Sequence, residues 1–220
     1  MTDTAALDLA SLLCSRLCHD MLSPVGALSN GLELLRDEKD PEMRKRCMEL
    51  LEQSAKASAD KLKFFRLAFG AAGGFGQMIA VHEARALITA LIGDSGRITL
   101  DWTLSGDELP KAAVKTLLNL AAIGIDALVR GGTLEVGAEM TGEASEIVIR
   151  AAGPRIAFDQ TIGRALDGSL PVGELSSRTA PAAMIHQLAA SAGGGVQWHQ
   201  GEDALVMGAV LPHAPSTSSG

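Results

Sequence analysis

Apolar residues recur at steps of three and four positions along the N-terminal part of the chain. They form one stripe, which stops where the charged segment "RDEKDP" begins at residue 36. The stripe consists of Leu9, Leu13, Leu17, Met21, Val25, Leu28, Leu32 and Leu35. This spacing is that of one helix face, so it predicts an amphipathic helix over residues 5–36.

The same spacing returns after the charged turn and predicts a second helix from residue 41 to about residue 69. Asp40 suits the N-cap of this helix, with Pro41 at its first position. The two helices then make an antiparallel hairpin with more apolar surface than two helices can cover. A four-helix bundle formed by two chains would cover it, which predicts a homodimer. The following domain would cover the same surface equally well.

The pattern changes after the glycine-rich segment "GAAGGFG" at 70–76, which predicts a domain boundary. Beyond it, strands and helices alternate, which indicates an α/β sandwich of one sheet against a helix layer. Helices are expected at 78–92, 110–130, 158–167 and 180–191, and strands at 97–104, 133–140, 146–153, "VQWHQ" and "ALVMGAVL". The predicted class is α+β, with a hairpin domain at 1–72, an α/β domain at 73–213 and a disordered tail at 214–220.

Composition narrows the classes of partner. A net charge of −7, an aromatic content of 3% and the absence of tyrosine argue against nucleic-acid binding. No run reaches the roughly 18 apolar residues of a membrane span, and no signal peptide is visible, so a cytoplasmic location away from membranes is expected. Three cysteines argue against a disulfide framework. Cys14 and Cys18 are expected to be small buried thiols and not metal ligands.

The stretch "CHDMLSP" at 18–24 places a histidine, an acid and a proline inside the first predicted helix. At about 100° per residue, His19 lies roughly 200° from the apolar stripe and points outward. Pro24 has no N–H for the carbonyl of Asp20, which loosens the helix at this level. Asp20 is placed to hold one ring nitrogen of His19 and leave the other nucleophilic. An ordinary surface histidine beside a solvated charge is the alternative.

The run "HDMLSPVGAL", from His19 to Leu28, resembles the phosphoacceptor motif of sensor histidine kinases. In that family an acidic residue follows the histidine, and a proline stands five places after it. The resemblance implies that His19 carries a phosphoryl group. It also implies that the α/β domain corresponds to the kinase ATP-binding domain, whose nucleotide-binding boxes can be compared with this sequence.

Each box departs from the kinase pattern. Ile123 stands where the second asparagine of the box that begins at Asn119 helps to hold Mg²⁺. Ala151 replaces the aspartate that accepts a hydrogen bond from adenine, and Pro181 replaces the last glycine of the phosphate loop. Together these departures predict that ATP binding is lost. No cofactor or metal ion is expected on this chain.

A kinase-like phosphoacceptor beside a degenerate ATPase-like domain resembles the dimeric histidine phosphotransferases of bacterial phosphorelays, most closely the ChpT type. The resemblance covers roughly residues 8–212. It implies that His19 takes phosphate from a receiver domain of a hybrid histidine kinase and passes it to response regulators, including a cell-cycle transcriptional regulator. Mg²⁺ would belong to the receiver. An active histidine kinase and a non-catalytic dimeric adaptor are the two alternatives.

Further roles are assigned around the phosphoacceptor. Arg16, one turn earlier, is expected to meet the phosphoryl group or an acidic rim on the receiver. Ser23 and Pro24 are expected to set the local backbone shape. Leu12 and Leu22 are candidates for docking the partner, with packing inside the helix bundle as the competing interpretation.

Overall fold

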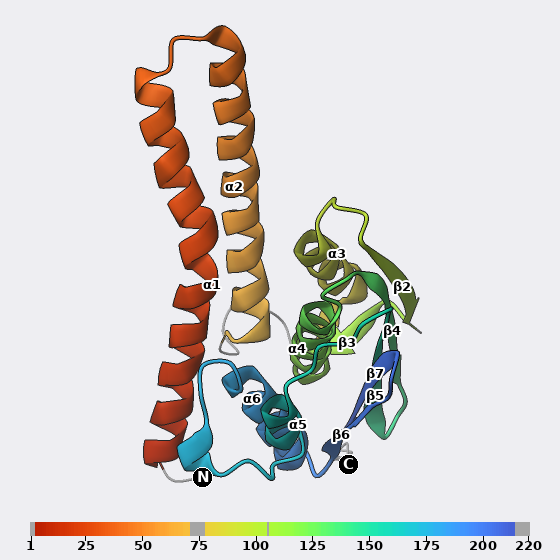
Figure 1. Cartoon of the computed structure of the whole chain (residues 1–220). Coiled ribbons are helices and arrows are strands. Elements are labelled where there is room, and N and C mark those ends of the chain that lie inside the picture. The colour runs from red at the N-terminus through yellow and green to blue at the C-terminus, as the bar shows by residue number, and fades with distance from the viewer. Residues whose placement is uncertain (1–2, 71–77, 105, 214–220) are drawn as a thin grey trace, which may run out of the picture.

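The computed structural model describes residues 3–70, 78–104 and 106–213 and begins with the predicted helical hairpin (Figure 1). Helix α1 spans Asp3–Asp37 and α2 spans Pro41–Ala68. Asp40 is the N-cap of α2, where its carboxylate accepts from the Glu42 N–H at 2.8 Å. The helix limits, the turn and the cap predicted from the sequence are therefore confirmed.

The second part of the chain is a mixed sheet covered by helices on one face. Its elements are β1 (Met78–Ala80), α3 (Val81–Ile92), β2 (Ile98–Leu104), β3 (Glu108–Pro110), α4 (Lys111–Ala127), β4 (Gly132–Met140), β5 (Ala144–Ala152), α5 (Gln160–Leu166), the 3-10 turn η1 (Val172–Glu174), α6 (Ala180–Ser191), β6 (Gly195–Gln200) and β7 (Ala204–Pro212). Five strands pair in the order β2-β4-β5-β7-β6, and only β2 and β4 run parallel. The helices lie between this sheet and the hairpin, as Figure 1 shows. The predicted α+β class and sandwich are confirmed.

The helix predicted at 78–92 is wrong over its first three residues. Met78–Ala80 is a strand that pairs antiparallel with β3. The pairing partner lies beyond α3 and β2, so local periodicity carried no signal for it. The predicted boundary at 70–76 and the tail at 214–220 lie outside the described residues, apart from Gly70.

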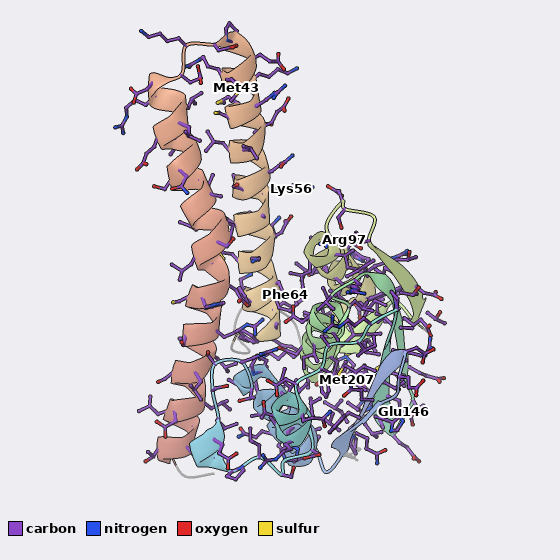
Figure 2. All side chains as sticks on the ribbon, in the orientation of Figure 1. Met43, Lys56, Phe64, Arg97, Glu146 and Met207 are labelled. Atoms are coloured by element: carbon purple, nitrogen blue, oxygen red, sulfur yellow. The ribbon has the colours of Figure 1, made fainter. Side chains whose placement is uncertain are left out.

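The core joins the hairpin to the α/β domain over only part of the hairpin. Leu9 is buried, and Leu13 and Leu17 pack partly buried against the same core cluster. Farther along α1, Val25 and Leu32 remain 49% and 59% exposed. The distal part of the hairpin, near the Met43 label, stands clear of the α/β domain in Figure 2. The domain thus covers the N-terminal half of the apolar stripe and leaves the distal half uncovered.

The cysteines correct one prediction. Cys14 and Cys18 are exposed, and Cys47 is buried. Each of the first two stands one position after a leucine of the stripe, and that offset of about 100° turns its thiol away from the core.

Within the described ranges, no helix is long and apolar enough to cross a membrane. The same ranges hold no cluster of three or more His, Cys, Asp or Glu suited to a metal ion.

Candidate functional site

His19 projects from α1 into solvent, with 81% of its side chain exposed. Its Nδ1 lies 3.1 Å from Oδ1 of Asp20, which is itself only 20% exposed. An ionised carboxylate can only accept, so this contact places the ring proton on Nδ1 and leaves the lone pair on Nε2. The His19 side chain is therefore exposed, and its contact with Asp20 sets which ring nitrogen carries the proton.

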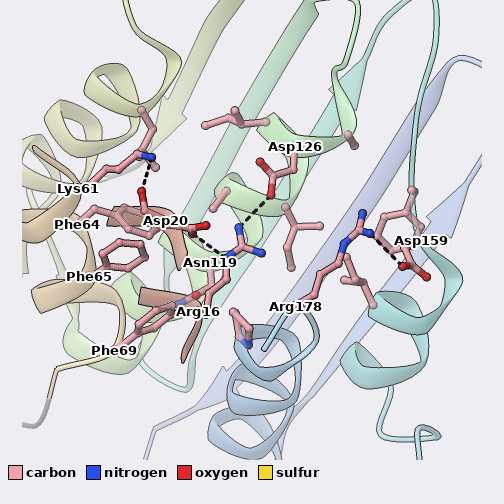
Figure 3. Close-up of a pocket in the computed structure, with 18 of the residues that line it drawn as sticks. Arg16, Asp20, Lys61, Phe64, Phe65, Phe69, Asn119, Asp126, Asp159 and Arg178 are labelled. Carbon is pink, nitrogen blue, oxygen red and sulfur yellow. Dashed lines mark hydrogen bonds and ion pairs between the residues drawn. The ribbon is translucent and has the colours of Figure 1, made fainter. Parts of the chain in front are cut away.

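Arg16 is bound within the molecule instead of facing outward. Its Nε donates to Oδ2 of Asp20 at 2.6 Å, and its Nη2 lies 3.4 Å from Oδ2 of Asp126 on α4. Burial by itself would lower the pKa of Arg16, but its hydrogen bonds and attraction to both carboxylates outweigh burial and raise that pKa. Figure 3 shows the guanidinium between the two acids. The guanidinium predicted to meet a phosphoryl group is therefore committed to orienting Asp20.

Two residues of this arrangement were missed from the sequence. Asp126 is the acidic residue in the mostly apolar run "LLNLAAIGIDAL". Its charge was a signal, but the sequence did not show which residue it would pair with. Lys61 of α2 donates from Nζ to the main-chain carbonyl of Asp20 at 2.9 Å. Nothing in the local pattern around Lys61 distinguishes it from the other lysines of α2.

The remaining predicted residues divide between surface and interior. Leu22 and Ser23 are exposed, and Leu22 has 71% of its surface free. Pro24 is buried, and α1 continues through it without interruption. Leu12 is partly buried against the core cluster, so packing accounts for it. Of the two docking candidates, Leu22 alone is fully presented to a partner.

A cavity of about 290 Å³ lies between the hairpin and helices α4, α5 and α6 (Figure 3). Asn119, Ile123 and Pro181, the positions compared with the kinase boxes, all line it. Asn119 donates through Nδ2 to the carbonyls of Lys115, at 2.8 Å, and Ala68, at 3.4 Å. Its Oδ1 is buried and has no partner among the described residues. The first box asparagine is thus used to hold the end of α2 against α4.

Ala151, where the kinases have their adenine-binding aspartate, is fully buried in β5. Helix α4 approaches this strand closely at Gly124. A Cβ atom added there would lie 2.7 Å from the side chain of Leu134 and 3.6 Å from the Cβ of Ala151. Protein packing therefore occupies the space next to Ala151, and alanine offers no acceptor for an adenine amino group.

Residues 81–204 match the model of the histidine phosphotransferase C-terminal domain family, which is more than half of the chain. The chain belongs to this family. The protein phosphotransferase ChpT of Brucella abortus (strain 2308) is 42% identical over 149 residues, which cover 68% of this chain and 69% of the relative. A solved structure of a bacterial phosphotransferase is 33% identical, covers 93% of this chain and 96% of its own, and superposes with a TM-score of 0.79. The chain is a histidine phosphotransferase of the ChpT type.

Proposed function

We propose that His19 is the phosphoacceptor of this histidine phosphotransferase. The observation that carries the proposal is the exposed imidazole, whose Nδ1 is held by Asp20 and whose Nε2 has no partner among the residues that the structure describes. Nε2 attacks the phosphorus of an aspartyl phosphate in line. The new Nε2–P bond forms as the P–O bond to the aspartate breaks, and the carboxylate leaves with the electron pair. The reverse reaction charges the next receiver, so catalysis consists mostly of positioning and charge compensation.

In this proposal the donor is a receiver domain of a hybrid histidine kinase. The acceptors are response regulators, including a cell-cycle transcriptional regulator, and the exchange takes place in the cytoplasm. The similarity to the Brucella protein phosphotransferase ChpT over two thirds of the chain supports transfer of the phosphoryl group to and from other proteins. Mg²⁺ at the reacting phosphoryl group belongs to the receiver. Leu22, three positions from His19 and 71% exposed, is the apolar contact offered to the receiver.

The phosphoryl group does not come from ATP bound to this chain. Supporting this, Ile123 presents a hydrocarbon to the cavity where a cation ligand is needed. Pro181, in the first turn of α6, has no N–H to give to a phosphate. Ala151 is buried without acceptor chemistry. An active kinase would need all three functions.

The active species is a homodimer. Supporting this, large apolar side chains remain exposed on the distal hairpin although the chain folds its own domain against the proximal half. They include Val25, Leu32, Met43 and Leu50. Exposed apolar side chains on two antiparallel helices provide the surface from which two hairpins form a four-helix bundle.

The deciding experiment mixes the purified chain with a phosphorylated receiver domain in the absence of ATP. We expect acid-labile, base-stable phosphate to appear on the chain and to vanish in His19→Gln. His82→Gln is the matched control, since His82 is another exposed histidine, on α3, and this variant is expected to accept phosphate normally. Transfer that survives in His19→Gln would disprove the assignment. Receiver binding without transfer would make the chain an adaptor.

A second measurement addresses the kinase alternative. Calorimetric titration with Mg-ATP is expected to give no heat of binding, and incubation with labelled ATP is expected to leave His19 unlabelled. Labelling of His19 by ATP in the absence of any receiver would show an active kinase and overturn the ATP-independent mechanism. The same protein sample, tested for transfer from a phosphorylated receiver, controls for loss of folding.

A further inference from the structure

The main-chain carbonyl of Asp20 has lost its ordinary partner within α1. In an α-helix each carbonyl accepts from the N–H four residues later, and for Asp20 that residue is Pro24. The helix is nevertheless continuous from Asp3 to Asp37. Lys61, which lies 41 residues away on the other arm of the hairpin, supplies the missing donor through Nζ at 2.9 Å. A bond internal to one helix has been replaced by a bond between the two helices.

Asp20 is consequently held at three points. Lys61 holds its carbonyl, Arg16 holds Oδ2, and Oδ1 faces the imidazole of His19. The side chain of Asp20 is largely buried, and Lys61 is half-buried beside it at the edge of the cavity. A hydrogen bond from an ammonium group is stronger than one from a neutral donor, and partial burial protects it from competition by water.

We propose that Lys61 is a positioning residue for the phosphoacceptor: it anchors the Asp20 main chain, so that the Asp20 carboxylate is in place to hold His19 in the Nδ1–H tautomer. This inference rests on the proposed role of His19. Pro24 and Lys61 act as a pair, because the proline frees the carbonyl and the lysine binds it. The pair ties the turn that carries His19 to α2 at one defined height, where apolar packing alone would permit sliding.

The first test follows transfer from a phosphorylated receiver to the chain by rapid quench over a range of receiver concentrations. Lys61→Met keeps the length of the side chain and removes its donor. We expect the maximal rate to fall about tenfold, because a small displacement of a reacting group slows the reaction by about this factor. The half-saturating receiver concentration should stay within about twofold of the native value. Lys61→Arg keeps a charged donor and should recover most of the rate. Lys63→Met removes an exposed lysine of the same helix, paired with Asp60, and should leave the rate unchanged.

The second test repeats the substitution in a Pro24→Ala background. Alanine restores an N–H that bonds the Asp20 carbonyl within α1, so Lys61→Met should now change the maximal rate by less than about twofold. Equal losses in both backgrounds would show that Lys61 acts through its charge on the phosphoryl group and would overturn the proposal. An unchanged rate on Lys61→Met in the native background would overturn it as well.

The nitrogen chemical shifts of the His19 ring give a readout that needs no phosphotransfer. In its neutral form the His19 ring of the native chain should show the Nδ1–H tautomer. Lys61→Met should show a mixture of the two tautomers, and Lys61→Arg should show the native pattern. A native tautomer in folded Lys61→Met would overturn the proposal even if the rate falls. Failure of the proposed function looks different, because the unmodified chain would then take no phosphate on His19.

Discussion

Arg16 on α1 and Asp126 on α4 form an ion pair, with Nη2 and Oδ2 3.4 Å apart, that joins the helix carrying His19 to the ATPase-like domain. The same guanidinium donates through Nε to Asp20, the residue that faces His19. The degenerate domain therefore contacts the turn that carries His19 through this ion pair. Although its nucleotide boxes are altered, it still contributes to the geometry of the site.

Substitution of Arg16 tests this contact. Arg16→Met keeps the apolar stem and releases Oδ2 of Asp20. The maximal rate of phosphotransfer should then fall about tenfold, because Asp20 is no longer held in the position from which it orients the imidazole. Asp126→Asn removes the charge at the 67% exposed end of the pair. It should change the free energy of unfolding by less than about 1 kcal/mol and the maximal rate by less than about twofold. A higher half-saturating receiver concentration in Arg16→Met, with an unchanged maximal rate, would show that Arg16 contacts the receiver instead.

The uncovered half of the hairpin predicts that a charged residue on its apolar stripe will disrupt the dimer. Leu32 belongs to the apolar stripe of α1 and is 59% exposed in the single chain. Leu32→Glu should shift the sedimentation of the protein from dimer to monomer, because a buried carboxylate at the dimer interface is costly. Leu34→Glu is the matched control, since Leu34 is 63% exposed but lies off the stripe, and it should sediment as the native protein does. A monomeric native chain, or equal effects of the two variants, would refute the predicted bundle.

Tight packing beneath α5 predicts a loss of stability on adding one methyl group. A Cβ on Gly163 would lie 2.3 Å from the indole ring of Trp198, so this bulky ring or the helix would have to shift. Gly163→Ala should lower the free energy of unfolding by about 1–3 kcal/mol. Gly173→Ala meets no atom within 4 Å and should stay within about 0.5 kcal/mol of the native value in the same urea titration. Equal stability of the two variants would contradict the contact.

The environment of Asp159 predicts that the stability of the protein depends on pH. Its carboxylate caps α5, and the hydrogen bonds from the Thr161 hydroxyl and main-chain N–H hold the pKa of Asp159 below its usual value. A lowered pKa in the folded state stabilises the protein above the unfolded pKa of about 4, and this contribution is lost as the pH falls through the folded pKa. Asp159→Ala should therefore cost about 1 kcal/mol at neutral pH, with the difference narrowing below about pH 4.

Urea unfolding of the native and Asp159→Ala proteins across this pH range measures the difference. Thr161→Val removes the hydroxyl donor and leaves the main-chain N–H bond to Asp159 in place. In a Thr161→Val background, the stability that Asp159 adds should therefore depend less on pH. A gap between native and Asp159→Ala proteins that widens with acidification would contradict the predicted sign.

Local patterns in the sequence determined the hairpin, its turn and the exposure of His19. A helix period, an N-cap at Asp40 and the outward angle of one side chain depend on near neighbours, so they could be predicted without any tertiary contact. The same holds for most of the sheet and its helices. The strand at Met78–Ala80 was missed because its partner lies far along the chain.

The tertiary structure alone decided which distant side chains complete the site. The sequence showed that Pro24 frees the carbonyl of Asp20, but only packing of α2 against α1 shows that Lys61 binds it. Likewise, Arg16 looked available to a phosphoryl group until the approach of α4 placed Asp126 beside it. Hydrogen bonds and ion pairs between helices depend on the relative positions of those helices. These positions are set by the packing of the whole core, so no local sequence pattern predicts them.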